Sequence, residues 1–220
     1  MQDIVLVGSS GHAKVVIDIV EKAGRYRIAG LIDGFRTPGE ETLGYPVLGG
    51  PSDLPALNAR FDLKGALVAI GDNSVRARVA AEVAALCPQL PFVTAIHPAA
   101  SVGNNVAIGA GTVVMAGAAV NPCCQVGRFC IVNTNASLDH DCVMEDYASL
   151  APGVTTGGNC RIGSHAAVSI GAVLRHGITI GEHSVVGAGS LVLGPVDAFS
   201  IAYGTPARKI RDRQPGDKYL

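Results

Sequence analysis

A histidine lies between two aspartates in the stretch NTNASLDHDCVMED, residues 133–146, of a chain otherwise rich in glycine and small apolar residues. At His140 the sequence places an imidazole, whose ordinary pKa is close to neutral, next to the carboxylates of Asp139 and Asp141. Such an imidazole can take a proton from an amine, and a carboxylate on its other nitrogen raises its basicity. We therefore interpret His140 as a candidate general base and Asp141 as the residue that orients it.

The residues around this stretch repeat with a period of six. Counting in sixes from Val102 to Val192 gives sixteen positions, all apolar except Thr156. A strict period of six fits neither an α-helix nor a single strand, and it is typical of a hexapeptide-repeat β-helix. Three hexads make one triangular coil. The position after each apolar residue is often glycine, which we interpret as a sharp turn that needs unusual backbone dihedrals.

In this frame, residues 18 apart stack above one another, at the strand spacing of about 4.8 Å. The column that contains His140 reads Pro122, His140, Gly158, His176. We expect Gly158 to leave an open patch above His140, where a thin part of a substrate could lie, with a backbone N–H nearby as a candidate oxyanion donor. His140 and His176 are two coils apart, ~9.6 Å, which is too far to share a metal ion. We therefore predict no metal site.

The composition excludes several classes of function. The formal net charge is −1, so the chain carries no electrostatic footprint for nucleic acid or an anionic membrane surface. No run of eighteen apolar residues is present, and the first residues lack the basic start of a signal peptide, so we predict a cytoplasmic protein. None of the six cysteines has zinc-site spacing, and most fall at inward-facing positions of the hexads.

Residues 1–92 have a different pattern, in which strand-like and helix-like segments alternate. Strands are predicted at 4–8, 27–33 and 63–71, and helices at 11–24 and 72–87. This alternation predicts a small Rossmann-like α/β domain with a parallel sheet. We therefore expect three parts: the α/β domain over 1–92, an all-β helix over 93–197, and a C-terminal capping tail over 198–220.

The segment GSSGH, residues 8–12, joins the first strand to the first helix. Gly8 and Gly11 permit a tight turn, and free backbone N–H groups at a helix start attract phosphate. Asp33, at the end of the second strand, lies where a ribose-binding acid belongs in such folds. A plain turn and a strand-end cap remain the alternatives, since the segment is not GxGxxG.

The order of motifs resembles a known family. Along nearly the whole chain run GSSGHAKVV, LIDG, AIGDN, IHPAASV, the hexads and YGTPARKI. This order is similar to that of the bacterial acetyltransferases that modify nucleotide-linked amino sugars, a family that includes sialic acid O-acetyltransferases. The resemblance implies a left-handed parallel β-helix, acetyl-CoA as co-substrate, and a homotrimer with active sites between subunits.

The resemblance also implies roles for individual residues. It assigns the catalytic histidine to His140. For the nucleotide-sugar it assigns Gly8, Ser10, Gly11, His12, Asp33, Gly34, the turn from Gly71 to Asn73, and Asn133. For acetyl-CoA it assigns Gly158, Ile170, Ala188, and the phosphate-facing Arg208 and Lys209, although Lys209 could equally belong to a solvated basic tail. Ser149 takes the place where the family often has a second histidine that touches the thioester, which leaves the side-chain partner of the carbonyl open.

Several functions remain open on the sequence. The first is acetyl-CoA-dependent N-acetylation of a nucleotide-linked 4-amino-4,6-dideoxy sugar, either GDP-perosamine or a UDP-linked relative. The second is O-acetylation of a sugar such as sialic acid on the same scaffold. A metal-dependent enzyme like the β-helix carbonic anhydrases and a protein that only binds nucleotide-sugars are further alternatives. The sequence does not identify the nucleotide base.

Overall fold

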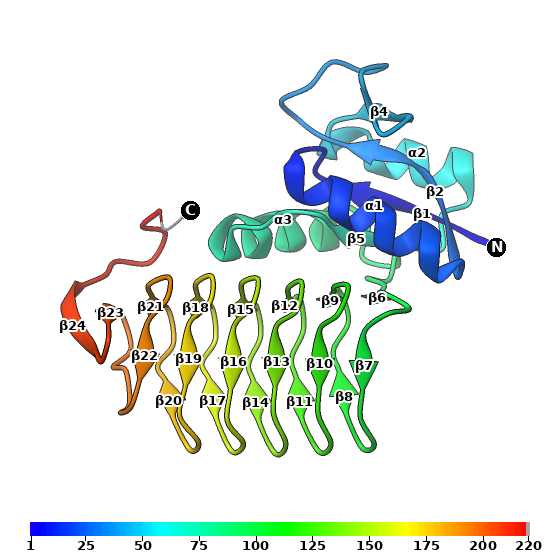
Figure 1. The fold of residues 1–220 in the computed structure, drawn as a ribbon. Coiled ribbons are helices and arrows are strands. Elements are labelled where there is room, and N and C mark those ends of the chain that lie inside the picture. The colour runs from blue at the N-terminus through cyan, green and yellow to red at the C-terminus, as the bar shows by residue number, and fades with distance from the viewer. Residues whose placement is uncertain (219–220) are drawn as a thin grey trace. The chain divides into compact units, whose positions relative to one another are not determined.

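The computed structural model describes residues 1–218, which form two compact units (Figure 1). The N-terminal unit comprises residues 1–71 and 75–98. The β-helix unit comprises residues 72–74 and the chain from Ala99 onward. The predicted assignment of separate roles to residues 1–92, 93–197 and 198–220 stays a prediction.

The N-terminal unit contains a five-stranded sheet in the order β3-β4-β2-β1-β5. The strands are β1 (Gln2–Val7), β2 (Tyr26–Ile32), β3 (Glu41–Thr42), β4 (Tyr45–Gly49) and β5 (Gly65–Val68). All neighbours are parallel except the hairpin β3–β4. The helices are α1 (Gly11–Ala23), η1 (Pro51–Asp53), α2 (Leu54–Phe61) and α3 (Asn73–Leu86), and a short strand β6 (Ala95–Ile96) follows. The predicted parallel α/β fold is confirmed, but α2 was not foreseen.

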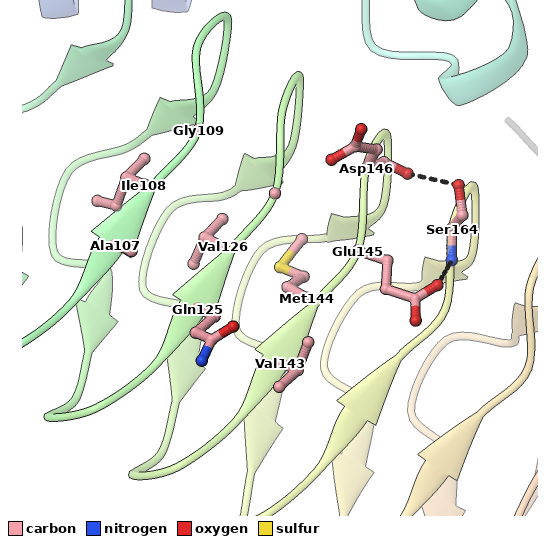
Figure 2. Close-up of a pocket in the computed structure, with 11 residues that line it drawn as sticks. Ala107, Ile108, Gly109, Gln125, Val126, Val143, Met144, Glu145, Asp146 and Ser164 are labelled. Atoms are coloured by element: carbon pink, nitrogen blue, oxygen red, sulfur yellow. Dashed lines mark hydrogen bonds between the residues drawn. The ribbon is translucent and has the colours of Figure 1, made fainter.

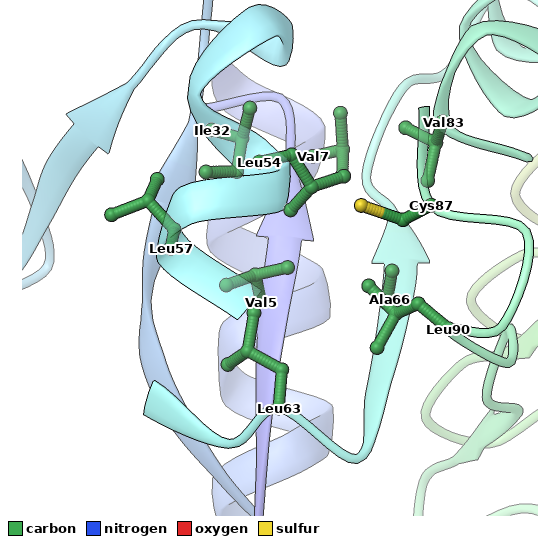
Figure 3. Packing of buried hydrophobic residues seen from close by; sticks show 10 residues of the cluster. All are labelled: Val5, Val7, Ile32, Leu54, Leu57, Leu63, Ala66, Val83, Cys87 and Leu90. Atoms are coloured by element: carbon green, nitrogen blue, oxygen red, sulfur yellow. The ribbon is translucent and has the colours of Figure 1, made fainter. Parts of the chain in front are cut away.

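The core of this unit is aliphatic (Figure 3). Val5 and Val7 of β1 meet Leu54 and Leu57 of α2, with Cys87 also buried in the cluster. Because residues 4–7 are almost fully buried, the end of β1 is fixed in the sheet. The GSSGH segment that follows therefore starts from a rigid point.

The β-helix unit consists of two-residue strands on three faces. The first face carries β7 (Ser101–Val102), β10 (Ala119–Val120), β13 (Ser137–Leu138), β16 (Thr155–Thr156), β19 (Val173–Leu174) and β22 (Leu191–Val192). The second face carries β8 (Ala107–Ile108), β11 (Gln125–Val126), β14 (Val143–Met144), β17 (Arg161–Ile162) and β20 (Thr179–Ile180). The third face carries β9 (Val113–Val114), β12 (Ile131–Val132), β15 (Ser149–Leu150), β18 (Ala167–Val168) and β21 (Val185–Val186). Paired strands are parallel and 18 residues apart, as for Ala119 and Ser137, which confirms the predicted repeat.

The third face ends with the antiparallel hairpin β23 (Ser200–Gly204) and β24 (Ala207–Asp212). β23 pairs with β21, so the hairpin covers the free edge of that strand. The buried Arg213 then donates from Nη1 to the carbonyl oxygen of His183 at 2.6 Å. The capping role predicted for residues 198–220 stays a prediction, and residues 219–220 lie outside the described part.

The turns correct one prediction. The positive-φ residues lie at every sixth position from Asn105 to Gly189, which is the fourth place of each hexad, counting the apolar residue as the first. The glycines directly after the apolar residues, such as Gly103 and Gly181, have no positive φ. A Cβ at either would instead come within 2.7 Å or less of an atom of the next coil. Glycine is needed there because adjacent coils approach closely, and not because the backbone turns.

Inside the β-helix, small side chains fill the space between the faces. The cysteines predicted to point inward, Cys124, Cys130, Cys142 and Cys160, are at most 1% exposed. All six cysteines are free thiols, and the burial of these four and of Cys87 agrees with their interpretation as packing residues. Cys123 is exposed, so the packing interpretation is wrong for this residue. Within residues 1–218, no helix is both long and apolar enough to cross a membrane.

Candidate active site

Three stacks of turns form the corners of the β-helix unit. The first corner joins the first face to the second and includes residues 121–124, 139–142, 157–160 and 175–178. The second corner joins the second face to the third and includes residues 127–130, 145–148, 163–166 and 181–184. The third corner returns to the first face and includes residues 133–136, 151–154, 169–172 and 187–190.

The predicted base and its orienting acid meet at the first corner. His140 Nδ1 lies 2.7 Å from Asp141 Oδ2, and both side chains are about half exposed. The hydrogen bond that His140 Nδ1 donates to Asp141 raises the pKa of His140, and the negative charge of Asp139 adds to the effect. Asp141 has φ 57°, a left-handed conformation that aspartate tolerates better than most residues. The pair has the geometry of a general base held by a carboxylate.

Asp139 has a different task from Asp141. Its Oδ1 accepts hydrogen bonds from the backbone N of His140 at 2.9 Å and from Asn121 Nδ2 at 2.8 Å. The bond from Asn121, followed by that from His140 N, lowers the pKa of Asp139. Its backbone N donates to Thr156 Oγ1 at 3.0 Å. Asp139 therefore fixes the turn that presents the imidazole.

Gly158 lies where the column predicted, but the open patch above His140 is absent. Gly158 is buried, and a Cβ built on it would lie 2.5 Å from both Cε1 and Nε2 of His140. The imidazole itself therefore covers Gly158. The next side chain in the column is His176, whose ring centroid is 6.1 Å from that of His140. Gly158 has no positive φ, and the three atoms nearest to such a Cβ all belong to the His140 ring, so close approach of the imidazole favours glycine here.

The residues predicted to hold acetyl-CoA lie at more than one corner. Gly158 is at the first corner, whereas Ile170 and Ala188 are exposed at the third. Asn133, predicted to bind the sugar, is also at the third corner, and its Oδ1 accepts from the backbone N of Thr134. One chain alone does not bring these residues together with His140.

Ser149 and Asn73 contact each other within the β-helix unit. Asn73 Nδ2 lies 3.1 Å from Ser149 Oγ on the third face and 3.1 Å from the carbonyl oxygen of Ala166. The Asn73 side chain is almost fully buried. Ser149, which replaces the thioester-binding histidine of the family, therefore lies on another face than His140. Its hydroxyl accepts a hydrogen bond from Asn73, a residue predicted to bind the nucleotide-sugar. Their assigned roles remain predictions.

In the N-terminal unit the structure brings GSSGH and Asp33 together. Ser9 donates to Asp33 Oδ2 from its backbone N at 3.1 Å and from its hydroxyl at 2.5 Å. Asp33 Oδ1 accepts from the backbone N of Phe35, next to Gly34, at 2.9 Å, and Thr42 Oγ1 donates to the carbonyl oxygen of Ser9. Sequence reasoning missed Ser9, although it lies inside the motif, and Thr42, for which no sequence signal exists.

The start of α1 supplies the other predicted nucleotide ligands. Ser10 is the N-cap and makes no side-chain capping bond, and Gly11 opens the helix after the positive-φ Gly8. Burial, with a smaller contribution from the Arg76 guanidinium, lowers the pKa of His12 to about 4. Arg76 donates to the carbonyl oxygen of Gly71 at 2.7 Å. His12 is therefore a neutral imidazole near neutral pH.

The two predicted phosphate ligands on β24 differ. Arg208 and Lys209 line a cavity of about 200 Å³ together with Gly194 and Asp197. Lys209 Nζ lies 2.7 Å from Asp212 Oδ1, and this ion pair raises its pKa. Arg208 bonds the carbonyl oxygen of Ala207 and makes no ion pair within residues 1–218. Of the two, Arg208 has the charge that a phosphate could use.

A larger groove on the second face contains none of the predicted residues (Figure 2). It has a volume of about 620 Å³ and a largely apolar floor that includes Val126 and Met144. Glu145 Oε2 accepts from the backbone N of Ser164 at 3.0 Å, and Ser164 Oγ donates to the carbonyl oxygen of Asp146. Both acidic residues bond the turns of the β-helix, and Glu145 also forms an ion pair with Arg161.

Known protein families match both parts of the chain. The PglD N-terminal domain matches residues 3–83, and the bacterial transferase hexapeptide (six repeats) matches residues 159–194. Within residues 1–218, no cluster of three or more histidine, cysteine, aspartate or glutamate side chains could hold a metal ion. The curated relative UDP-N-acetylbacillosamine N-acetyltransferase of Bacillus subtilis is 35% identical over 119 residues, so the match spans about half of each protein, 53% of this chain and 52% of the relative.

Solved structures of acetyltransferases match nearly the whole chain. A histidine variant of perosamine N-acetyltransferase from Caulobacter crescentus, in complex with CoA and GDP-perosamine, is 35% identical with a TM-score of 0.90, covering 96% of this chain and 98% of its own. The acetyltransferase domain of PglB from Neisseria gonorrhoeae, in complex with acetyl-CoA, is 31% identical with a TM-score of 0.87, covering 95% and 99%. Because the identity exceeds 30% over almost both full lengths, this chain belongs to the family of acetyl-CoA-dependent nucleotide-amino-sugar N-acetyltransferases.

Proposed function

We propose that this protein transfers the acetyl group of acetyl-CoA to the 4-amino group of a nucleotide-linked 4-amino-4,6-dideoxy sugar, with GDP-perosamine or a close relative as acceptor, in the cytoplasm. The observation that carries the proposal is the His140–Asp141 pair, with 2.7 Å between Nδ1 and Oδ2, in a chain that is 35% identical to a perosamine N-acetyltransferase. The pair supplies the one group that the chemistry requires, a base for the amine.

The chemistry of the reaction suits this pair. An acetyl thioester is already activated, so the enzyme must mainly position the reactants and provide a neutral amine. As the amine nitrogen bonds to the carbonyl carbon, His140 Nε2 takes one of its protons. Asp141 holds Nδ1 and stabilises the imidazolium that forms. The C–S bond then breaks, and the proton leaves with CoA as its thiol.

For the nucleotide-sugar we propose the start of α1 and the Ser9–Asp33 cluster. The backbone N–H groups after Ser10 offer hydrogen bonds to a diphosphate, and no acidic residue lies in the first turn of α1 to repel it. His12 is held neutral, so it can accept or donate a hydrogen bond without adding charge.

For acetyl-CoA we propose a groove between neighbouring chains of a homotrimer. Gly158 lies at the first corner and Ile170 and Ala188 at the third, so a cofactor that contacts all three needs two chains. Arg208 is proposed to bind phosphate at the nucleotide end, because no acid occupies its guanidinium within residues 1–218. Cross-linking and light scattering measure the oligomeric state.

One experiment tests the proposed function. The purified protein is incubated with acetyl-CoA and a panel of UDP-, GDP- and dTDP-linked 4-amino sugars, and with sialic acid as a hydroxyl acceptor, while thiol release is recorded. We expect acetyl transfer to the amine, highest with the GDP-linked sugar, and product mass confirms an amide. Transfer only to a hydroxyl would instead establish the O-acetyltransferase alternative.

A further inference from the structure

The direction of the His140 ring limits how a substrate can reach its reactive nitrogen. Nδ1 is bonded to Asp141, so Nε2 is the nitrogen left to take a proton. A Cβ on Gly158 would lie 2.5 Å from Nε2, so this nitrogen faces along the column toward the next coil. An amine that bonds Nε2 must therefore enter the first corner beside Gly158.

His176 borders the same space. It lies one coil beyond Gly158 in the column, its side chain is exposed, and its ring is tilted by 49° to that of His140, with the centroids 6.1 Å apart. Its Nε2 lies 3.5 Å from Asn159 Nδ2. Within residues 1–218 it has no carboxylate within salt-bridge distance, in contrast to His140. One imidazole of the pair is held by an acid, and the other keeps an N–H for a ligand.

We propose that His176 is a second catalytic residue, which donates a hydrogen bond to the thioester carbonyl oxygen as that oxygen becomes negatively charged. This inference rests on the proposed function and gives the carbonyl the side-chain partner that the sequence left open. Ser149, the position expected to supply it, is on the third face and receives a hydrogen bond from Asn73. His176, in contrast, lies in the column of the base itself.

His140 and His176 have separate roles in the reaction, and its atoms and charges balance. When the amine attacks, the C–N bond forms and the carbonyl π electrons move to oxygen, where the His176 N–H stabilises them. His140 Nε2 takes the amine proton. When the oxyanion collapses, the C=O bond is restored, the C–S bond breaks, and the thiolate takes the proton from His140. The products are the acetamido sugar and CoA thiol, and both imidazoles return to their initial state.

The test compares His176→Leu, His176→Gln and the neighbouring control Arg175→Ala in the full-length protein. We expect kcat of His176→Leu to fall by about 100-fold, the usual loss for one oxyanion donor, with both KM values within about 3-fold of wild type. His176→Gln, which keeps an N–H donor, should recover part of the rate. Arg175→Ala should leave kcat and thermal stability unchanged. The acid limb of the pH profile, which belongs to His140, should stay in place in every variant.

A measurement without turnover separates this inference from the proposed function. The carbonyl stretch of bound acetyl-CoA, labelled with carbon-13 in the acetyl group, should lie at lower frequency in wild type than in His176→Leu. If wild type acetylates none of the sugars, the proposed function fails, yet the carbonyl stretch still tests His176. An unchanged stretch, or a kcat of His176→Leu within about 3-fold of wild type, overturns the role of His176.

Discussion

The first and second corners of the β-helix are built on the same hexad but use histidine in different ways. At the second corner, Phe129, Tyr147, His165, His183 and Phe199 stack ring on ring, with centroids 4.4–5.0 Å apart and interplanar angles of at most 16°. At the first corner, His140 and His176 are separated by Gly158 and tilted by 49°. Stacked rings cover each other, whereas the tilted pair stays exposed.

The place within the hexad explains this difference. Phe129, Tyr147, His165 and His183 occupy the fourth place, where φ is positive and each ring stacks on the next. Phe199 follows His183 by 16 residues and extends the stack beyond the hexads. His140 occupies the third place, and Asp141 takes the positive-φ position beside it. A histidine at the fourth place becomes part of a stack of rings. His140 and His176, both at the third place, are exposed to solvent, and His140 also gains a carboxylate. The backbone repeat is the same at both corners, and the side chains at each place determine whether a corner is packed or carries exposed reactive groups.

The largest expected effect comes from removing the base. His140→Asn should lower kcat by about 10²–10⁴-fold, because the amine loses its proton acceptor, while acetyl-CoA binding changes little. Steady-state kinetics and calorimetric titration of acetyl-CoA measure the two quantities. His183→Asn is the matched control at the second corner, where we expect a lower melting temperature and an unchanged kcat. Full activity of His140→Asn would remove this residue from the mechanism.

A pair of glycine variants separates ring placement from backbone strain. Gly158→Ala has an ordinary φ but puts a Cβ into the His140 ring, so the ring must move, and kcat should fall by about 10–100-fold. Gly153→Ala, at the third corner, has φ +68° and open space around its Cβ, so it should cost about 1–2 kcal/mol of stability and leave kcat unchanged. If both variants kept wild-type kcat, the ring position would not matter.

These two glycines also show what the sequence could and could not predict. The period of six, the column of His140 and the burial of four cysteines inside the β-helix follow from apolar residues at fixed spacing, and the structure confirms them. The sequence placed His140 under Gly158 but left space between them, because spacing gives positions of backbones and not rotamers of side chains. The imidazole turns along the axis because Asp141 holds its Nδ1.

Contacts between residues distant in sequence are the other feature that the sequence could not predict. Nothing in the hexads indicates that Asn73 reaches Ser149, 76 residues later, because this contact does not follow from the periodicity. The same holds for Thr42, which bonds the Ser9 carbonyl across 33 residues. Residue types that follow a family motif were found, whereas hydrogen-bond partners set by tertiary packing were not.

The orienting acid should have a smaller effect than the base itself. Asp141→Gly removes the carboxylate but tolerates the φ of 57°. We expect kcat/KM at neutral pH to fall by about 2- to 10-fold, since exposed ion pairs contribute little. Because Asp141 is the main cause of the raised pKa of His140, the acid limb of the pH–rate profile should move to lower pH. An unmoved limb would contradict the orienting role.

The smallest effect concerns the stacked histidines and appears in stability instead of rate. Burial is the main cause of the lowered pKa of His183; the Arg213 guanidinium lowers it further, and Glu182 opposes them. His165 and Phe199 flank the ring on its two faces. Because the folded pKa lies below the unfolded value near 6.5, the unfolded chain binds more protons between them, and stability falls as pH drops from about 6.5 through the folded pKa.

His183→Phe removes this titration while it keeps a ring in the stack. Its melting temperature should therefore fall less than that of wild type between pH 7 and pH 5, by a difference of less than about 4 °C. His12, whose pKa is lowered to about 4, titrates in the same direction, so the variant keeps part of the pH dependence.

His140→Asn is the informative counterpart, because the pKa of His140 is raised and its protonation favours the folded state. Removing that residue should make the loss of stability on acidification slightly larger, the opposite of His183→Phe. If the melting temperature changed equally with pH in the two variants, protonation of histidine would affect stability in the same way at both corners.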